Sequence, residues 1–166
     1  MSGLIRNLST LIWALFAHGQ VHATSRISCR FFVTPFDCGA SVLKSDKYLQ
    51  LVESAQLDFL IKTKLLGKLV RSGVHFVNAS QLVKFIKPVR MFTQVRIETS
   101  IIYADEKCAY FSHLFFVQNQ QHGEVLVKMK FKKGLVTISP MKIVGGLPSV
   151  KHEHLSAWDQ ALNAMQ

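Results

Sequence analysis

The chain has 166 residues, of which 49% are hydrophobic and 18% charged, which indicates one globular domain with its own core and excludes an intrinsically disordered chain. A formal net charge of +10 favours an anionic partner, such as a phosphorylated small molecule, a membrane surface or nucleic acid. The alternative is a basic domain without such a partner.

Residues 1–24 form the first predicted unit, an amphipathic helix. Apolar residues recur at helical spacing from Leu4 to Phe16, but the strongest apolar run, residues 11–17, is far shorter than the roughly 20 residues that cross a bilayer. Arg6 and a small-residue motif at 21–23 also resemble a secretory signal. Three cysteines without a disulfide pattern favour the cytoplasm, with a helix at 4–16 that docks on the domain or contacts a membrane peripherally.

The next predicted elements are a strand over residues 27–35, a turn over 36–39 and a long helix over 46–66. Ser45 or Asp46 is the expected N-cap of the helix. The helix is apolar on nearly every side, and a helix of that kind is usually enclosed by protein. We therefore expect the rest of the domain to wrap around it.

Four strand-like segments follow with no second helix between them. They span residues 74–87, 94–103, 108–118 and 125–132, with a turn at 105–107, a loop at 119–123 and a short extended piece at 135–139. The third segment is apolar on both faces, which is typical of a central strand covered on both sides. The fourth has one basic face, formed by Lys128, Lys130 and Lys132.

One strand, a long helix and four antiparallel strands predict an α+β protein with the hotdog fold, in which a curled antiparallel sheet wraps around one central helix. We expect this domain over residues 25–150, followed by an irregular tail or short helix over 151–166, with the helix at 156–165. A single curled sheet leaves exposed edge strands, so a homodimer or a dimer of dimers is expected.

Several motifs occur in a fixed order along this framework: Pro35-Phe36-Asp37, Tyr48-Leu49, Glu53, Phe85–Val89, Val95–Thr99 and Tyr103–Lys107. Together they resemble hotdog thioesterases of the 4-hydroxybenzoyl-CoA thioesterase type, above all the "thioesterase superfamily member" branch with an N-terminal apolar helix. The resemblance covers about residues 4–146. It implies hydrolysis of an acyl-CoA thioester to a free acid and a thiol, with coenzyme A only as part of the substrate.

The family's usual active-site signature is changed in this chain. Aligned on Tyr48, its two aspartates fall on Phe36 and Cys38, its histidine on Val42, and its paired asparagines on Lys44 and Ser45. The acid that is present, Asp37, lies one position from the place of the usual catalytic aspartate.

Thioester hydrolysis needs a carboxylate that activates water or attacks the carbonyl, and amide donors for the developing oxyanion. Asp37, in the turn before the long helix, is the candidate carboxylate. The candidate donors and substrate-binding residues are Gly39, Ser45, Asp46 and Tyr48 at the start of the helix. The alternative is that Asp37 only caps the turn.

Glu53 is the second candidate acid, because it lies on a helix that we expect to be mostly buried. A structural role, with a hydrogen bond to Gln56, is the commoner outcome for such a residue. Cys38 is a weaker candidate nucleophile, for which a small packed thiol is the usual explanation. His75 and His113 lie on predicted strands, where we expect satisfied core or surface residues rather than ligands, and the sequence shows no metal site.

Lys84, Lys87 and Arg90 cluster near a strand end, where a basic rim suits the phosphates of coenzyme A. The lysines at 128, 130 and 132 are more typical of a solvated strand face. A non-catalytic acyl-CoA or acyl-carrier binding module remains the alternative function. Nucleic acid is not expected as a partner, because the sequence has no recognition helix and no exposed aromatic platform.

Overall fold

A computed structural model describes residues 22–146 and 150–165, so the N-terminal helix expected at 4–16 lies outside the described residues. The elements in chain order are β1 Ile27–Phe32, the 3-10 turn η1 Pro35–Asp37, α2 Ser45–Lys62, α3 Leu65–Arg71, β2 His75–Phe85, β3 Gln94–Ala104, β4 Ala109–Val117, β5 Gln120–Lys133, β6 Val136–Ile138, α4 Pro140–Val144 and α5 Glu153–Asn163. No helix in these ranges is long and apolar enough to cross a membrane.

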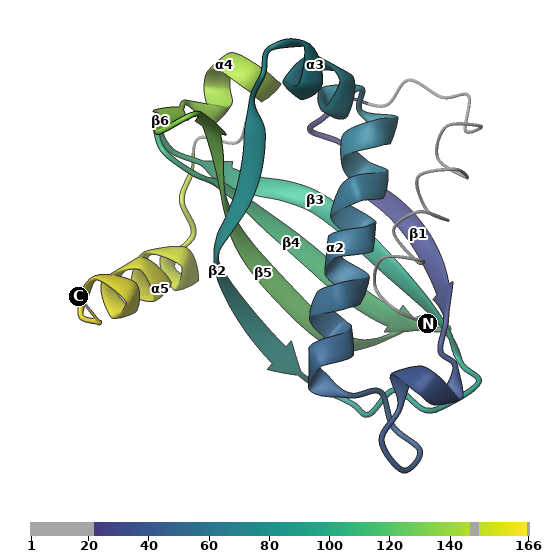
Figure 1. Ribbon diagram of the computed structural model, residues 1–166. Helices are drawn as coiled ribbons and strands as arrows, with labels where there is room; N and C mark the ends of the chain where they lie inside the picture. Colours follow the sequence, from purple (N-terminus) through teal and green to yellow (C-terminus); the bar gives the residue numbers. More distant parts are fainter. Residues whose placement is uncertain (1–21, 147–149, 166) are drawn as a thin grey trace.

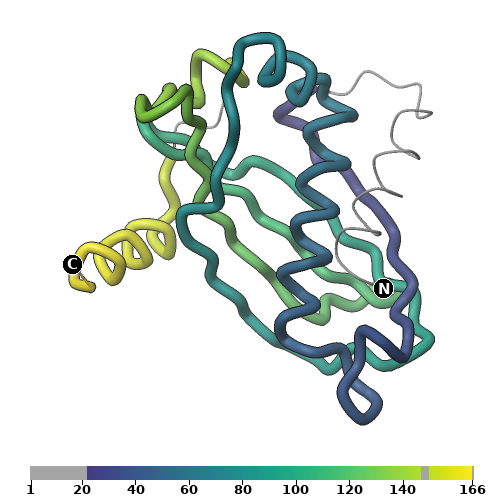
Figure 2. Tube along the Cα trace, in the orientation of Figure 1, coloured from purple at the N-terminus to yellow at the C-terminus, as the bar shows by residue number. Residues whose placement is uncertain are grey.

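One antiparallel sheet curls around α2 (Figure 1). Its strands follow the order β1-β3-β4-β5-β2, with β6 paired to β5, and the tube view shows how they bend around the helix (Figure 2). This arrangement confirms the expected α+β hotdog fold. It also leaves β1 and β2 as the two ends of the strand order.

The strand pattern of the sequence explains which side chains enter the core. Every second residue of β3, from Val95 to Ile101, is buried on the side of the helix. Phe111 and Phe115 of β4 face the same way, and Phe111 packs edge to face on Phe59 of α2 with ring centroids 5.6 Å apart. Such an aromatic pair adds about 0.5–1.5 kcal/mol to the apolar area that it buries.

The opposite face of β4 is covered as well, as its two apolar faces predicted. Tyr110 of β4 lies in a separate buried cluster with Leu126 of β5 and with Leu155 and Trp158 of α5. Because Tyr110 and Phe111 are neighbours on one strand, they point to opposite faces of the sheet. Helix α5 therefore packs on the face of the sheet that points away from α2.

Most residues of α2 are buried, among them Leu51, Val52, Ala55, Phe59 and Leu60. The remaining stripe contains Gln50, Glu53, Leu57 and Ile61, which are only partly buried or, in the case of Glu53, exposed. The expectation that Glu53 is buried is therefore wrong for this chain: a single curled sheet reaches around the helix from one side and leaves its outer stripe uncovered.

Three boundaries differ from the sequence prediction. The long helix does not run to residue 66, because Lys64 adopts a left-handed conformation (φ 58°) that separates α2 from α3. The loop expected at 119–123 is mostly strand, because β5 already begins at Gln120 and Gln118, with φ 55°, makes the tight turn. The tail that begins at Pro140 contains the short helix α4, which the sequence analysis missed.

Candidate functional site

The turn η1 fixes Asp37 beneath the start of α2. The Asp37 carboxylate oxygen Oδ2 accepts hydrogen bonds from the Thr34 amide (3.0 Å) and the Thr34 hydroxyl (2.7 Å). Pro35 occupies the first turn of η1, where its missing amide hydrogen costs nothing. Asp37 is 3% exposed, and its carbonyl accepts a hydrogen bond from the Lys44 amide. The carboxylate is thus held rigidly, and it also caps the turn.

A tight loop connects η1 to α2. The Gly39 amide donates to the Val42 carbonyl at 2.9 Å, and the Leu43 amide donates to the Val89 carbonyl at 2.9 Å. Cys38 and Leu43 form an isolated bridge that closes the loop. Because the Gly39 amide already has an acceptor, this geometry does not leave it free to stabilise an oxyanion, contrary to our expectation.

The start of α2 offers other amide donors. The N-cap is Lys44, whose side chain makes no capping hydrogen bond, so neither Ser45 nor Asp46 is the cap that the sequence predicted. An α-helix begins with four amides that have no partner inside the helix, and the helix dipole makes this end favourable for negative charge. The amides of Ser45 and Asp46, in the first turn of α2, are therefore the candidate oxyanion donors.

A pocket of about 330 Å³ lies beside this helix start. It is lined by Val42, Leu43, Ser45, Tyr48, Phe85, Ile86, Lys87 and Pro88. These residues come from the tight loop, the first turn of α2 and the end of β2, so the curl of the sheet brings them together. Polar and apolar atoms contribute about equally to its walls, and Lys87 adds one cation, which suits a ligand that has an apolar part and an anionic part.

Tyr48 forms the inner wall of this pocket. Its ring packs on Phe85 and on Phe115, each with ring centroids 5.0 Å apart, and burial raises the pKa of its hydroxyl. Gly123 of β5 lies close behind the ring, since an added Cβ at this position would be 3.4 Å from Tyr48 Cε1 and 3.1 Å from the Lys84 carbonyl oxygen. Because Gly123 has no side chain, the Tyr48 ring can pack directly against the backbone of β5.

The three basic residues predicted to bind coenzyme A are only partly brought together. Lys87 lines the pocket, and its Nζ donates to Gln120 Oε1 at 3.0 Å. Arg90 is exposed and pairs in a bridge with Val42 of the tight loop, whereas Lys84 is exposed on β2, and neither lines the pocket.

Other sequence candidates lie away from this arrangement or lack the needed chemistry. Glu53 is exposed on the open stripe of α2 and does not line the pocket. Burial raises the pKa of the Cys38 thiol, which favours the protonated form, and a protonated thiol is a poor nucleophile. In residues 22–146 and 150–165, no group of histidine, cysteine and acidic side chains is placed to hold a metal ion.

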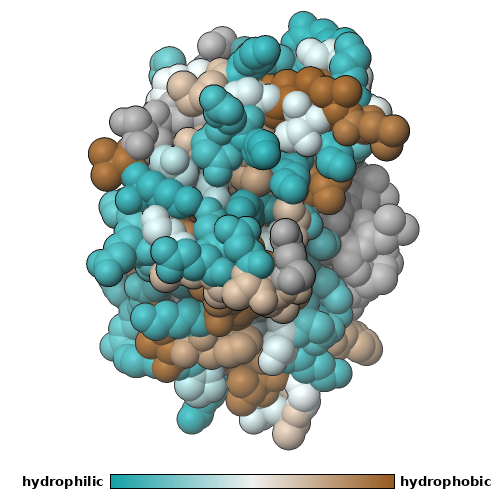
Figure 3. Space-filling view, turned by 90° about the vertical axis from the view of Figure 1, so that its left-hand side faces the viewer, coloured by the Kyte–Doolittle hydropathy of each residue, from teal (hydrophilic) through white to brown (hydrophobic). Residues whose placement is uncertain are grey.

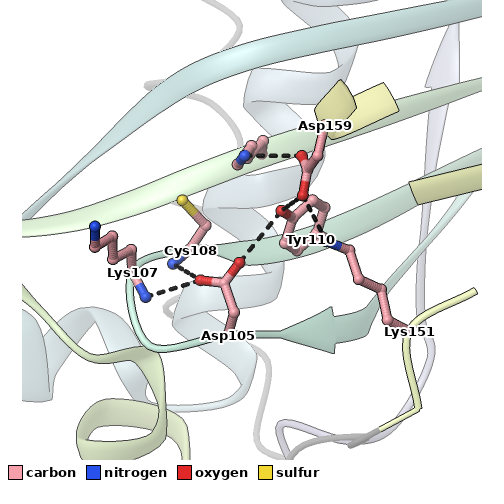
Figure 4. Close-up of polar contacts among 7 residues, drawn as sticks. Asp105, Lys107, Cys108, Tyr110, Lys151 and Asp159 are labelled. Carbon is pink, nitrogen blue, oxygen red and sulfur yellow. Dashed lines mark hydrogen bonds and ion pairs between the residues drawn. The ribbon is translucent and has the colours of Figure 1, made fainter. Parts of the chain in front are cut away.

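Sequence reasoning missed a polar cluster under α5 (Figure 4). Asp159 of α5 accepts hydrogen bonds from Lys128 (2.8 Å), Lys151 (2.6 Å) and the Tyr110 hydroxyl (2.6 Å). Burial alone would raise the pKa of Asp159, but these three donors lower it to about 2. The Tyr110 hydroxyl also lies 3.3 Å from Asp105 Oδ2. The cluster attaches α5 to the sheet. The sequence gives no indication that Tyr110 and Asp159, which are 49 positions apart, are in contact.

His113 is a core residue, one of the two outcomes expected, but only one of its ring nitrogens has a hydrogen-bond partner among the described residues. Its ring is fully buried on the side of the sheet that faces α2, and Nδ1 lies 3.0 Å from the Thr99 hydroxyl. Its Nε2 has no hydrogen-bond partner among the described residues. Burial lowers the pKa of His113 to about 3, so the ring is neutral at physiological pH.

Comparison with solved structures finds the same fold at low sequence identity. A probable thioesterase from Bartonella henselae matches with a TM-score of 0.63 and 16% identity over 69% of this chain and 98% of that chain. A hypothetical protein from Thermus thermophilus has a TM-score of 0.66 and 18% identity over 72% and 93% of the two chains. A mutant of 4-hydroxybenzoyl CoA thioesterase complexed with 4-hydroxybenzoyl CoA has a TM-score of 0.62 and 16% identity over 72% and 98%.

Comparison with curated protein sequences gives no match. A family model does match: that of the Thioesterase-like superfamily aligns with residues 33–137, which is more than half of the chain and includes η1, α2 and all of β2 to β5. The resemblance inferred from the motifs is therefore confirmed, and the chain belongs to the Thioesterase-like superfamily.

Proposed function

We propose that the protein is an acyl-CoA thioesterase, which hydrolyses an acyl thioester to a free acid and a thiol. The observation that carries this proposal is the pocket at the start of α2, where apolar side chains, the first amides of the helix and Lys87 meet in a chain of the Thioesterase-like superfamily. The solved structure of 4-hydroxybenzoyl CoA thioesterase with its acyl-CoA ligand has the same fold, which supports this substrate class.

In the proposed reaction, water attacks the thioester carbonyl carbon while the Asp37 carboxylate takes one proton from the water. A C–O bond forms, the carbonyl oxygen becomes negatively charged, and the amides of Ser45 and Asp46 stabilise it. The C–S bond then breaks, and the sulfur leaves as a thiol with the proton that Asp37 accepted. The two hydrogen bonds from Thr34 orient the carboxylate for this transfer.

The apolar side chains of the pocket, including Tyr48, receive the acyl group, and the phosphates of coenzyme A lie toward Lys87. Lys84 and Arg90 are exposed near the same end of β2 and supply further positive charge for these phosphates. Glu53 has a catalytic role only in an assembly where a second subunit covers the open stripe of α2.

We also propose that the protein is a homodimer, alone or as half of a dimer of dimers. Strand β2 is 11 residues long and ends the strand order, so its outer edge has unpaired backbone groups. Val77, Leu82 and Phe85 of this strand are exposed, which supports burial of this edge against a second copy.

All three cysteines are free thiols, which supports a location in a reducing compartment such as the cytoplasm.

A non-catalytic acyl-CoA binding module is the second candidate. It is favoured by the position of Asp37, whose carboxylate is buried and already completes the capping box of η1. Such a protein would keep the pocket and the basic residues and would bind the thioester without turnover.

Release of free thiol from a panel of acyl-CoA chain lengths distinguishes the two functions. We expect turnover of at least one substrate, and we expect Asp37→Asn to lower kcat/KM at least about a hundredfold, the contribution typical of a general base. Glu106→Gln, which removes an exposed acid in the β3–β4 turn, is the matched control. A folded Asp37→Asn protein that keeps its rate would remove Asp37 from the mechanism, and tight binding of every acyl-CoA without turnover would establish the binding module.

A further inference from the structure

The end of α2 that lies far from the pocket is surrounded by positive charge. Helix α3, the turn between β5 and β6, and helix α4 lie together at this end (Figure 1). Residues 63–73 and 132–144, which build it, contain no aspartate or glutamate and six cations: Lys64, Lys68, Arg71, Lys132, Lys133 and Lys142. We name this surface the basic end. An 18-residue helix is about 27 Å long, so α2 separates the basic end from the pocket.

The basic end is held together by a contact between two of its elements. Lys68 Nζ of α3 donates to the Ile143 carbonyl of α4 at 2.5 Å, and Lys68 remains exposed. The other five cations of the basic end make no side-chain ion pair with described residues. Ion pairs within the part of the chain that the structure describes therefore do not neutralise this positive charge.

Aliphatic side chains project from the same surface. Leu135, at the tip of the β5–β6 turn, is 97% exposed, and Gly134 before it has the positive φ (59°) that forms the tip. Val136, Met141 of α4 and Val70 of α3 are each at least half exposed. Figure 3 shows hydrophobic side chains near the upper end of the molecule, between hydrophilic ones. Single exposed aliphatic residues are common in soluble proteins, but several on neighbouring elements among unpaired cations indicate an interaction surface.

The described chain also begins at this end. A pocket of about 370 Å³ at the junction of α2 and α3 is lined by His22 and Ala23 together with Lys62, Lys64, Lys68 and residues of α4. In the sequence, the apolar stretch of residues 4–16 lies only a few positions before His22.

We propose that the basic end docks on an anionic membrane surface. In this arrangement the exposed lysines contact lipid phosphates and carboxylates, while Leu135, Val136 and Met141 enter the boundary between headgroups and acyl chains. Nucleic acid fits less well, because residues 63–73 and 132–144 include no aromatic side chain on which a base could stack. The docking places the thioester pocket on the side away from the membrane, and it does not depend on catalysis.

The test is sedimentation of the full chain with vesicles of phosphatidylcholine alone or with roughly 30% phosphatidylserine. We expect binding to the anionic vesicles and little binding to the neutral ones. The paired substitution Lys133→Glu and Lys142→Glu should lower the partition coefficient at least about 25-fold, at about fivefold per lysine. Leu135→Ser with Val136→Ser should lower it independently of salt, whereas the lysine-dependent part should fall between about 0.1 M and about 0.5 M salt.

The matched control is Lys84→Glu with Arg90→Glu, which makes the same charge change near the pocket. We expect it to bind anionic vesicles at least five times more tightly than the Lys133 and Lys142 variant. All four positions are exposed, and unchanged thermal unfolding of each variant shows that the comparison is between folded proteins. Equal binding to neutral vesicles, an equal loss in both charge variants, or tighter binding to single-stranded DNA than to vesicles would overturn the proposal.

Discussion

Acid should destabilise this protein through one buried histidine, His113. Its folded-state pKa is about 3, whereas an exposed histidine has a pKa of 6.5. Above about pH 6.5 the ring is neutral in both states, so it does not change the free energy of unfolding with pH. As the pH falls from 6.5 toward 3, the unfolded chain takes up a proton that the folded chain cannot accept, so stability falls.

The size of this effect follows from the two pKa values. Each pH unit within the window between 3 and 6.5 costs about 1.4 kcal/mol, so the loss at about pH 5 is about 2 kcal/mol. That is a large fraction of the roughly 5–15 kcal/mol that stabilises a typical domain. The cause is the burial of the ring between β4 and α2, where Nε2 has no described partner that could share a positive charge.

Urea denaturation at about pH 7 and about pH 5 measures the effect when the wild type is compared with the double variant His113→Leu and Thr99→Val. The double variant removes both members of the buried hydrogen bond, so no polar group is left alone. We expect its loss of unfolding free energy between the two pH values to be smaller than that of the wild type by about 2 kcal/mol. His75→Gln, at an exposed position of β2, should keep the wild-type pH dependence. The reasoning is refuted if the double variant loses as much stability as the wild type.

Two further predictions concern packing and the attachment of α5, and both are measured by chemical denaturation. Gly123→Ala should destabilise the protein by about 1–3 kcal/mol, because the new methyl group would press on Tyr48 and on a neighbouring backbone carbonyl. Gly67→Ala in α3, where the methyl meets only a flexible side chain 3.6 Å away, should instead stabilise by up to about 1 kcal/mol, and equal signs for the two would contradict the packing argument. Asp159→Asn should cost about 1–3 kcal/mol by weakening its charged hydrogen bonds, while Glu153→Gln at an exposed position of the same helix should cost much less.

Hydrophobic pattern alone was sufficient to predict most of the sheet. The apolar residues on both faces of β4 indicated a central strand, and its position in the strand order and its burial confirm this. The errors in the boundaries of α2 and β5 came from backbone conformations that cannot be inferred from residue type. Lys64 and Gln118 both adopt positive φ, although neither is glycine, so the break after α2 and the early start of β5 were not predictable.

Of the residues predicted for the site, Ser45, Tyr48 and Lys87 line the pocket, and their roles stay predictions. Asp37 lies in the turn η1 shortly before α2, as the sequence predicted, but its side chain is not among the residues that line the pocket. The use of the Gly39 amide inside the loop depends on a bond to Val42 that spacing does not reveal. The buried histidine with an unpaired nitrogen and the Tyr110–Asp159 contact depend on tertiary packing, which a single sequence does not specify.

The polarity of α2 accounts for part of the charge arrangement but not for all of it. At the first turn, backbone amides favour a negative oxyanion or phosphate, and at the last turn, Lys62 complements the partial negative charge of the carbonyls. The influence of the helix dipole falls off within one turn, however. Lys133 and Lys142 lie on β5 and α4, outside α2, so they do nothing for that dipole. No carboxylate of the described residues pairs with either lysine, and Leu135, in the same turn as Lys133, is almost fully exposed. In the arrangement that we propose, an anionic lipid surface supplies both the negative charge and the apolar boundary for this end of the molecule.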